Sequence, residues 1–231
     1  MSTTSDVTVQ LVTRTLVWSV LSAALLFIPA GTLAWPEGWI YLTLACGLGL
    51  LSGLILAKHD PALLKERLGS PVQKEQKGWD KLLISVFIVL FLAMYVVAGL
   101  DAVRFGISHM PVWLEGIGAA GVLFGSYVFH IVMLTNTFAA PVVKIQTERK
   151  HAVISSGPYA YVRHPMYGGA IALILGTGLL LGSWYAVAIG VAAILLLAYR
   201  SVLEEETLKR ELEGYAAYAE RVRHRMVPGL W

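Results

Sequence analysis

Charged residues are scarce in this chain of 231 residues: 14% are Asp, Glu, Lys or Arg, whereas 57% are hydrophobic. Soluble domains carry about 25% charged residues, so the composition excludes an ordinary soluble globular protein. Cysteine occurs once, as Cys46, which excludes an intramolecular disulfide framework. Because Cys46 lies in an apolar run, we interpret it as a packing residue.

Common signatures of soluble binding sites are missing as well. The six histidines include no pair four residues apart and have no accessory cysteines, so the sequence predicts no metal site. No G-x-G-x-x-G turn follows a soluble strand and opens a helix, which argues against a Rossmann nucleotide site. Gly121 and Gly125 instead lie four apart in an apolar stretch, a spacing typical of close packing between membrane helices.

The chain has instead a series of long charge-free stretches, each near the roughly 20 residues that cross a membrane. Four are evident, at 15–35, 38–57, 82–100 and 116–135. A fifth, 166–199, would be about 50 Å long as a single helix, so we expect it to break near Gly182 into an antiparallel hairpin. The sequence therefore predicts an all-α, polytopic integral membrane bundle of about six spans.

Basic residues fall almost entirely on one side of this predicted bundle. If the N-terminus is cytoplasmic, every Lys and Arg except Arg104 lies in a tail or connection on the cytoplasmic side. The positive-inside rule therefore predicts that both termini are cytoplasmic. The net charge of +3 is then explained by orientation and contact with anionic membrane lipid, and no nucleic-acid partner is predicted.

The chain divides into two parts by the distribution of its polar segments. Residues 1–136 carry four predicted spans and a polar cytoplasmic linker at 58–81, in which we expect a short amphipathic helix at 61–68. Residues 137–231 carry a polar loop, the predicted hairpin 165–213 and a C-terminal tail. The ionisable clusters of the loop 141–167 and of the far end of the hairpin both lie in this second part, which is where we expect the chemistry.

The start of the hairpin has the features of an anion-binding helix terminus. Pro165 suits the first helical position, because it has no N–H to leave unpaired there. We expect the N–H groups of Met166, Tyr167 and Gly168 to be free, as in helix termini that bind anions. Gly168 and the following glycine remove side-chain bulk, which predicts close approach of a carboxylate or a ribose.

The far end of the hairpin carries Arg200, Glu204 and Glu205. Arg200 and Glu204 are four residues apart and share a helical face, so a surface ion pair is one interpretation. An antiparallel hairpin, however, returns both glutamates to the neighbourhood of His164. Carboxylates, an arginine and an imidazole at one mouth favour a pocket for a zwitterionic ligand that bears a ribose.

These motifs resemble those of a known family. The resemblance rests on Gly157-Pro158-Tyr159, Arg163-His164-Pro165-Met166-Tyr167-Gly168, Arg200 with Glu204-Glu205, and a tail with Gly214-Tyr215, Tyr218, Val222, Arg225 and Pro228. Together they are similar to the isoprenylcysteine carboxyl methyltransferase family and its relatives among the phospholipid N-methyltransferases. The resemblance covers about 138–228 and implies a multi-span helical membrane enzyme that uses S-adenosylmethionine.

The resemblance also implies roles for individual residues. The implied cofactor-binding residues are Lys144, Gln146, His151, Tyr159, Arg163, His164, Pro165, Tyr167, Gly168, Glu204 and Glu205. The implied catalytic residues are Arg200, Glu204 and Arg163, with Arg200 facing the substrate. The site is expected on the cytoplasmic side, in the cell inner membrane of a prokaryote or the endoplasmic reticulum of a eukaryote.

The methyl acceptor is the point on which the sequence leaves alternatives open. A lipophilic or lipid-modified acceptor is expected, most like a prenylcysteine α-carboxylate, which is already ionised near pH 7 and needs no general base. A phospholipid amine or a small thiol is also compatible. The enzymatic alternative is an NADPH-dependent membrane reductase of the sterol or enone type, and a non-enzymatic transporter or scaffold is the third class.

Overall fold

The computed structural model describes residues 4–70, 72–73 and 76–231; positions 71, 74 and 75 of the predicted linker 58–81 lie outside the described residues, as do 1–3. The described chain is helical, and its β contact is an isolated bridge between Val162 and His224. The main elements are α1 (Thr4–Ala30), α2 (Pro36–His59), α3 (Pro61–Arg67), α4 (Gly78–Ala98), a π-helical turn (Gly99–Arg104), α5 (Val112–Thr135), α6 (Pro165–Leu180), α7 (Trp184–Glu211) and α8 (Tyr215–Arg221).

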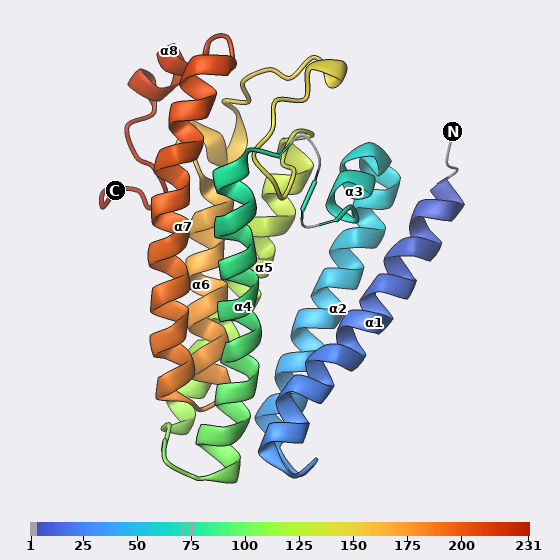
Figure 1. The fold of residues 1–231 in the computed structure, drawn as a ribbon, viewed down its shortest axis with the longest axis vertical. Helices are drawn as coiled ribbons and strands as arrows, with labels where there is room; N and C mark the ends of the chain where they lie inside the picture. Colours follow the sequence, from blue (N-terminus) through green and yellow to red (C-terminus); the bar gives the residue numbers. More distant parts are fainter. Residues whose placement is uncertain (1–3, 71, 74–75) are drawn as a thin grey trace.

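The long helices run side by side in two groups (Figure 1). Helices α4 to α7 form a tight bundle, and the α1–α2 pair diverges from it toward the end at which the chain begins. That end also carries α3, the long loop after α5 and α8, and we call it the α8 end (Figure 1). The opposite end, which carries the α1–α2 and α6–α7 connections, is called the turn end.

Five helices of the described chain are long and apolar enough to cross a membrane, and α6 is a shorter apolar helix of 16 residues. The prediction of an all-α, multi-span bundle is therefore confirmed, while the number of crossings and their orientation stay predictions. The predicted hairpin is also confirmed, because α6 ends at Leu180 and α7 begins at Trp184. Gly182 takes a left-handed φ of 73° in the turn, and Ser183 caps α7 by accepting a hydrogen bond from the Ala186 N–H at 3.0 Å.

Helices α5 and α6 pack backbone to backbone through glycines. A Cβ added to Gly125 would lie 2.6 Å from the Gly169 carbonyl oxygen, and one added to Gly176 would lie 2.6 Å from the Gly118 carbonyl oxygen. Real side chains do not tolerate such distances, so these positions need glycine. The close packing predicted from Gly121 and Gly125 is confirmed, and it places the start of α6 firmly against the end of α5.

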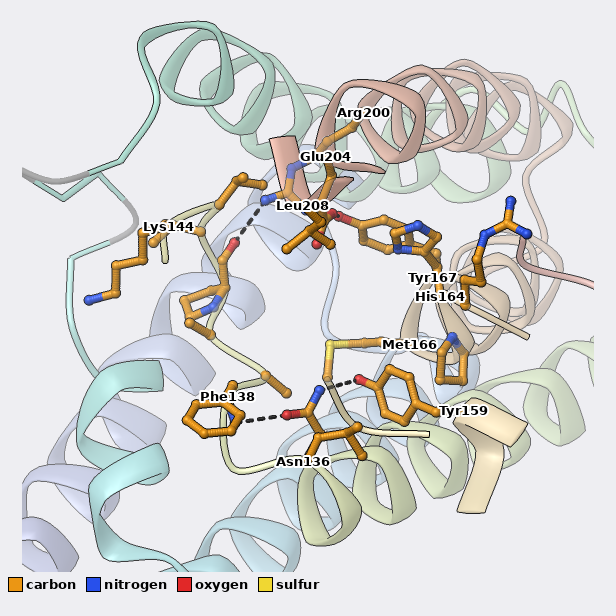
Figure 2. Close-up of a pocket in the computed structure, with 18 of the residues that line it drawn as sticks. Asn136, Phe138, Lys144, Tyr159, His164, Met166, Tyr167, Arg200, Glu204 and Leu208 are labelled. Atoms are coloured by element: carbon orange, nitrogen blue, oxygen red, sulfur yellow. Dashed lines mark hydrogen bonds and ion pairs between the residues drawn. The ribbon is translucent and has the colours of Figure 1, made fainter. Parts of the chain in front are cut away.

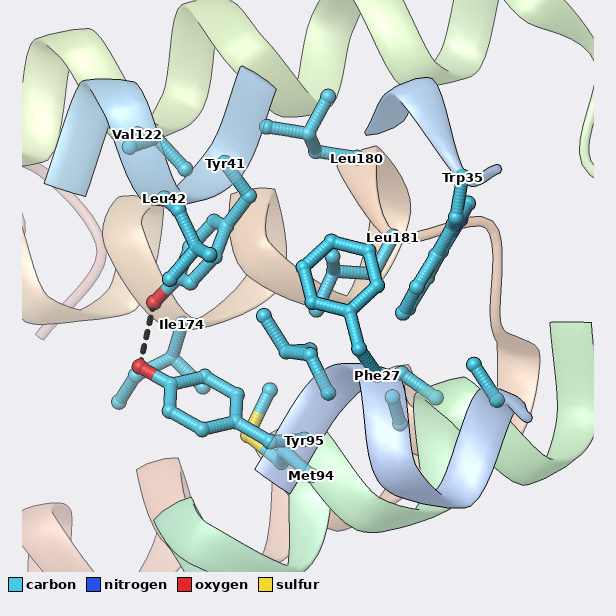
Figure 3. Close-up of a cluster of buried hydrophobic side chains, with 14 of the residues drawn as sticks. Phe27, Trp35, Tyr41, Leu42, Met94, Tyr95, Val122, Ile174, Leu180 and Leu181 are labelled. Carbon is cyan, nitrogen blue, oxygen red and sulfur yellow. Dashed lines mark hydrogen bonds between the residues drawn. The ribbon is translucent and has the colours of Figure 1, made fainter. Parts of the chain in front are cut away.

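The main hydrophobic core lies toward the turn end and joins α1 and α2 to the bundle (Figure 3). Phe27 and Trp35 meet edge to face with ring centroids 5.9 Å apart. The buried hydroxyls of Tyr41 on α2 and Tyr95 on α4 are 2.7 Å apart and hydrogen-bond to each other. One hydroxyl donates and the other accepts, so each of these two buried polar groups has a hydrogen-bond partner inside the bundle.

Some predicted boundaries were wrong, because charge-free stretches mark the apolar part of a helix and not its ends. The first span was predicted at 15–35, whereas α1 begins at Thr4 and ends at Ala30. The third was predicted to end at Leu100, whereas helical turns continue to Arg104. The short linker helix predicted at 61–68 is confirmed by α3.

Candidate functional site

The two predicted charged clusters meet at the α8 end, where the C-terminal tail also joins them. Pro165 is the first residue of α6, as predicted, and His164 is the N-cap residue without a side-chain capping hydrogen bond. The N–H groups of Arg163 and His164 donate to the His224 and Arg225 carbonyls at 3.0 and 2.7 Å. These two bonds hold the tail against the start of α6, so the tail becomes part of the site.

The predicted free N–H groups are not available at two of the three positions. The Tyr167 and Gly168 N–H groups donate to the His164 carbonyl oxygen at 3.1 and 3.2 Å. With Pro165 as first helical residue, Gly168 is the fourth, and its N–H makes the first regular intrahelical bond. A Cβ on Gly168 would lie 2.7 Å from the Met226 carbonyl oxygen, so the tail backbone, rather than a ligand, occupies the space above this glycine.

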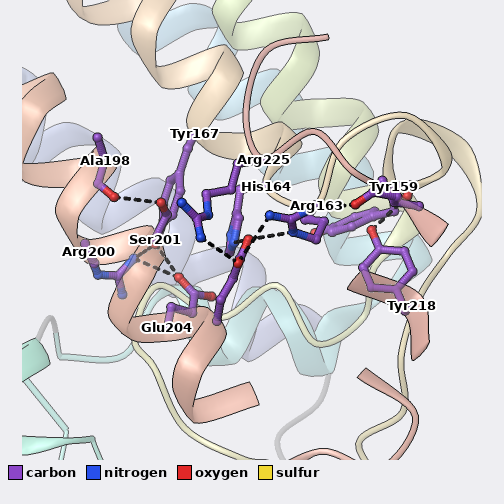
Figure 4. A network of polar contacts seen from close by, with 12 residues as sticks. Tyr159, Arg163, His164, Tyr167, Ala198, Arg200, Ser201, Glu204, Tyr218 and Arg225 are labelled. Atoms are coloured by element: carbon purple, nitrogen blue, oxygen red, sulfur yellow. Dashed lines mark hydrogen bonds and ion pairs between the residues drawn. The ribbon is translucent and has the colours of Figure 1, made fainter. Parts of the chain in front are cut away.

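Glu205 is the centre of a buried polar cluster, whose other members Arg163, His164 and Arg225 are labelled in Figure 4. Its carboxylate accepts hydrogen bonds from Arg163 Nε at 2.6 Å and Arg225 Nη2 at 3.1 Å, and His164 Nε2 lies 3.2 Å away. Arg163 also donates to the Val222 and Arg223 carbonyls. Glu205 therefore joins α7, the start of α6 and the tail, and we call it and its three side-chain partners the Glu205 cluster.

Arg200 is the centre of a second set of contacts one turn away (Figure 4). Its Nε donates to Asp80 Oδ1 at 2.6 Å, and its Nη1 contacts the Tyr167 hydroxyl and lies 3.8 Å from Glu204 Oε2. The Tyr167 hydroxyl donates in turn to Glu204 at 2.6 Å. Asp80, at the start of α4, is fully buried and was not predicted, because nothing near it in the sequence connects it with Arg200.

A cavity of about 300 Å³ opens beside these groups (Figure 2). This volume lies at the lower end of the range of small-molecule sites. The predicted site residues that line it are Lys144, His151, Tyr159, Arg163, His164, Pro165, Tyr167, Arg200 and Glu204. Those that do not line it are Gln146, Gly168 and Glu205.

Gln146, Lys144 and His151 hold the loop that covers the cavity. The Gln146 side chain donates to the Phe138 carbonyl at 3.0 Å and accepts from Arg149 at 2.8 Å. Lys144 pairs with Glu66 of α3 at 2.8 Å, so its charge is directed to α3. His151 packs on the Phe138 ring at 4.5 Å, and burial together with the Arg149 charge lowers the pKa of its imidazole.

The part of the cavity near α8 is aromatic and carries hydroxyl groups. Asn136 donates to the Tyr159 hydroxyl at 2.8 Å, and the Tyr218 hydroxyl donates to the Tyr159 carbonyl at 2.8 Å. Burial raises the pKa of Tyr159 and of Tyr215, and raises that of Tyr218 to about 12, so all three phenols stay protonated. The Tyr215 hydroxyl is buried and has no hydrogen-bond partner among the described residues.

The opposite part of the cavity enters the bundle and is apolar. Its lining there comes from α4, α5, α6 and α7, with Ile84, Phe87, Phe129, Ala170 and Leu197. Within the described part of the chain, no group of three His, Cys, Asp or Glu side chains is placed to hold a metal ion. The cavity thus offers an aromatic polar compartment outside the bundle and an apolar one inside it.

Comparisons with known proteins agree with these features. The model of the isoprenylcysteine carboxyl methyltransferase (ICMT) family matches residues 117–210. Protein-S-isoprenylcysteine O-methyltransferase B of Arabidopsis thaliana is 28% identical over 113 residues, which are 48% of this chain and 57% of that protein. The chain therefore spans little more than half the length of this curated relative.

The fold has a solved counterpart. The eukaryotic intramembrane Ras methyltransferase ICMT superposes with a TM-score of 0.56 and 18% identity, over 100% of this chain and 99% of the other. Together with the five long apolar helices, this likeness supports an integral multi-pass membrane protein. The resemblance predicted from the motifs is thus confirmed: residues 117–210 match the isoprenylcysteine carboxyl methyltransferase family, and the whole chain has the corresponding membrane fold.

Proposed function

We propose that this protein is an integral membrane methyltransferase that uses S-adenosylmethionine to methylate the α-carboxylate of a prenylated cysteine. The observation that carries the proposal is the two-part cavity, which joins a polar aromatic compartment at the α8 end to an apolar one inside the bundle. A water-soluble cofactor and a lipophilic acceptor need such a pair of compartments, since each must reach the same point from a different solvent. The family match over 117–210 supports the same reaction class.

The residues of the outer compartment fit S-adenosylmethionine. A purine ring suits the space among Tyr159, Leu208 and Leu212, where aromatic and aliphatic side chains meet. The unpartnered Tyr215 hydroxyl supplies a hydrogen bond that the chain itself leaves unused. Glu204, which lines the cavity, supplies a carboxylate for the cationic end of the ligand. When bound, S-adenosylmethionine supplies a methyl group on a positively charged sulfur.

Methyl transfer to a carboxylate requires alignment rather than proton transfer. A carboxylate oxygen forms a bond to the methyl carbon while the carbon–sulfur bond breaks, and the electron pair of that bond stays on sulfur. The acceptor is ionised at neutral pH, so no general base is needed. The protein therefore acts by holding two ligands in line, and rigid positioning of this kind supplies several kcal/mol, roughly 7–11 in favourable cases.

The orientation of the chain follows from the same proposal. We place the α8 end on the cytosolic side, because Lys and Arg are concentrated in the connections and tail at that end. The acceptor then enters from the surrounding membrane lipid, while the cofactor enters from the cytosol. In a prokaryote the membrane is the inner membrane, and in a eukaryote it is that of the endoplasmic reticulum.

The test uses full-length protein in detergent, titrated calorimetrically with S-adenosylhomocysteine and, in parallel, with NADPH. We expect saturable binding of S-adenosylhomocysteine, weakened at least about tenfold in Glu204→Gln, since a charged hydrogen bond contributes about 1.5–3 kcal/mol. The matched control is Glu206→Gln, because Glu206 is an exposed neighbour on the same helix. Binding of NADPH alone would replace this proposal with a reductase.

Acceptor class is tested by methyl transfer from labelled S-adenosylmethionine. We expect labelling of an S-farnesyl cysteine derivative, and no labelling of phosphatidylethanolamine or of a small thiol. Base-labile product identifies a methyl ester and therefore carboxyl transfer. Labelling of the amine or the thiol instead would retain the methyltransferase and reject the carboxylate acceptor.

A further inference from the structure

A second cavity of about 300 Å³ lies inside the bundle, against α1, α2, α4 and α5. Its lining is mostly apolar and includes Leu48, Leu56, Phe91 and Met133. Arg67, the last residue of α3, lines this cavity and also the cofactor cavity. A single guanidinium group therefore stands where an apolar compartment within the bundle approaches the proposed site of methyl transfer.

Arg67 differs from the other arginines that line the cofactor cavity. Arg163 pairs with Glu205 at 2.6 Å, and Arg200 pairs with Asp80 at 2.6 Å. Among the residues that the structure describes, no carboxylate lies within ion-pair distance of Arg67. Its Nη1 donates to the Ala139 carbonyl oxygen at 2.8 Å, and this bond holds the side chain in place.

The surroundings of Arg67 disfavour an uncompensated charge. Burial lowers the pKa of its guanidinium to about 10, yet the group is still charged at neutral pH. Arg67 is partly buried, and a cation largely removed from water without a counter-ion is destabilising; a ligand anion with the right geometry reverses that effect. The hydrogen bonds of Arg67 to the described residues are both made by Nη1, so its Nε and Nη2 present the planar fork that a carboxylate fits.

Arg200 is the arginine that the sequence predicted would face the substrate, and each of its three nitrogens already has a contact. Besides Asp80 and the Tyr167 hydroxyl, it contacts the Pro141 carbonyl at 3.3 Å. A second carboxylate there would have to displace these contacts or share the guanidinium with Asp80. Arg67 can accept an anion without any such loss.

We propose that Arg67 binds the carboxylate of the methyl acceptor, and that the acceptor's apolar chain extends from the apolar compartment of the cofactor cavity past Phe129, which lines both cavities, into the second cavity. This inference rests on the proposed function and adds the residue that selects a carboxylate over a neutral group. Arg200, held by Asp80, then positions Tyr167 and Glu204 and does not contact the acceptor.

The test compares an S-farnesyl cysteine derivative with its carboxamide, two probes that differ only in charge at the acceptor group. In the wild-type protein with S-adenosylhomocysteine bound, we expect the carboxylate to bind at least about tenfold more tightly than the carboxamide. In Arg67→Gln we expect this preference to disappear, with the affinity for the carboxamide and for S-adenosylhomocysteine unchanged. Lys65→Gln, at an exposed position of the same short helix, should behave as wild type.

The other outcomes reject the inference, and they distinguish failure of the Arg67 role from failure of the proposed function. A carboxylate preference retained in Arg67→Gln, with S-adenosylhomocysteine still bound, rejects the role of Arg67 and leaves the methyltransferase intact. Equal affinities for the two probes in wild-type protein reject it without any variant. If Arg67→Gln fails to bind S-adenosylhomocysteine, Arg67→Lys, which keeps the charge but loses the fork, must show a reduced preference. Failure of wild-type protein to bind S-adenosylhomocysteine rejects both proposals.

Discussion

Two buried carboxylates, at opposite ends of the α6–α7 hairpin, have different surroundings. Glu205, at the α8 end, is bound by two guanidinium groups and an imidazole, and two of these partners line the cofactor cavity. Asp101, at the turn end, accepts hydrogen bonds from Ser108 and Ser183, and it lines neither of the two cavities. Both acids are nearly inaccessible to solvent.

The comparison shows that a buried acid alone does not identify a site. The Asp101 contacts form a closed set: the Ser108 hydroxyl donates to Asp101 and accepts from the Trp184 N–H at 3.1 Å, while Ser183 caps α7. They join the π-helical turn, the loop before α5 and the start of α7. The Glu205 cluster, in contrast, borders a cavity lined by Tyr215, whose buried hydroxyl has no partner among the described residues, and by Arg67, which has no carboxylate partner among them. We therefore assign a structural role to the first acid and a site-forming role to the second.

The largest expected effect is that of Glu205→Ala. Removing this carboxylate leaves the nearly buried Arg163 and the partly buried Arg225 without a counter-ion, and breaking such a buried pair destabilises by about 3–5 kcal/mol. We expect a large fall in the thermal unfolding midpoint in detergent and loss of S-adenosylhomocysteine binding. Glu206→Ala is the matched control, because its exposed pair with Arg210 contributes at most about 1 kcal/mol. Equal stability of the two variants would contradict the assignment.

Asp101→Ala should separate stability from binding. It leaves the Ser108 and Ser183 hydroxyls without their acceptor, and each unsatisfied buried group costs about 1–3 kcal/mol. We expect a lower unfolding midpoint, while S-adenosylhomocysteine affinity at a permissive temperature stays within about twofold. Asp101→Asn, which keeps one acceptor oxygen, should fall between wild type and Asp101→Ala. A parallel loss of affinity would show that the two ends of the hairpin are coupled. It would contradict the purely structural role assigned to Asp101.

The sequence predicted the features that depend on local spacing. The turn at Gly182 follows from the length of the apolar stretch, and the hairpin geometry then brings Glu205 back to His164. The start of α6 at Pro165 was likewise predictable from its backbone chemistry. The prediction that the N–H groups at this start are free was wrong at two positions, because the His164 carbonyl accepts hydrogen bonds from both.

Contacts between distant parts of the chain were beyond prediction from the sequence. Asp80 and Arg200 are 120 residues apart, and neither lies in a sequence motif that identifies the other as its partner. Arg225 was part of the tail that carried the resemblance, but its partner was unknown until the tail was seen against α6. Arg67 looked like one charge among several in a polar linker, since its burial depends on how α3 packs against the loop after α5.

The smallest expected effect distinguishes two tyrosines of α8 that differ in one hydrogen bond. The Tyr218 hydroxyl donates to the Tyr159 carbonyl at 2.8 Å, whereas the buried Tyr215 hydroxyl has no partner in the described chain. Tyr218→Phe should therefore lower the free energy of unfolding by about 1 kcal/mol, because it leaves a carbonyl unpaired. Tyr215→Phe removes a group that the fold does not use, so we expect unchanged or slightly higher stability.

If the Tyr215 hydroxyl binds the cofactor, cofactor affinity should fall more in Tyr215→Phe than in Tyr218→Phe, the reverse of the order for stability. We expect Tyr215→Phe to weaken S-adenosylhomocysteine binding about threefold to tenfold, the range of one neutral hydrogen bond, measured by calorimetric titration. Loss of stability without loss of affinity in Tyr215→Phe would mean that this hydroxyl has a partner within the fold. The Glu205 cluster would then border a cavity with one fewer donor for the cofactor, and the contrast with the closed Asp101 contacts would rest on Arg67 and Glu204 alone.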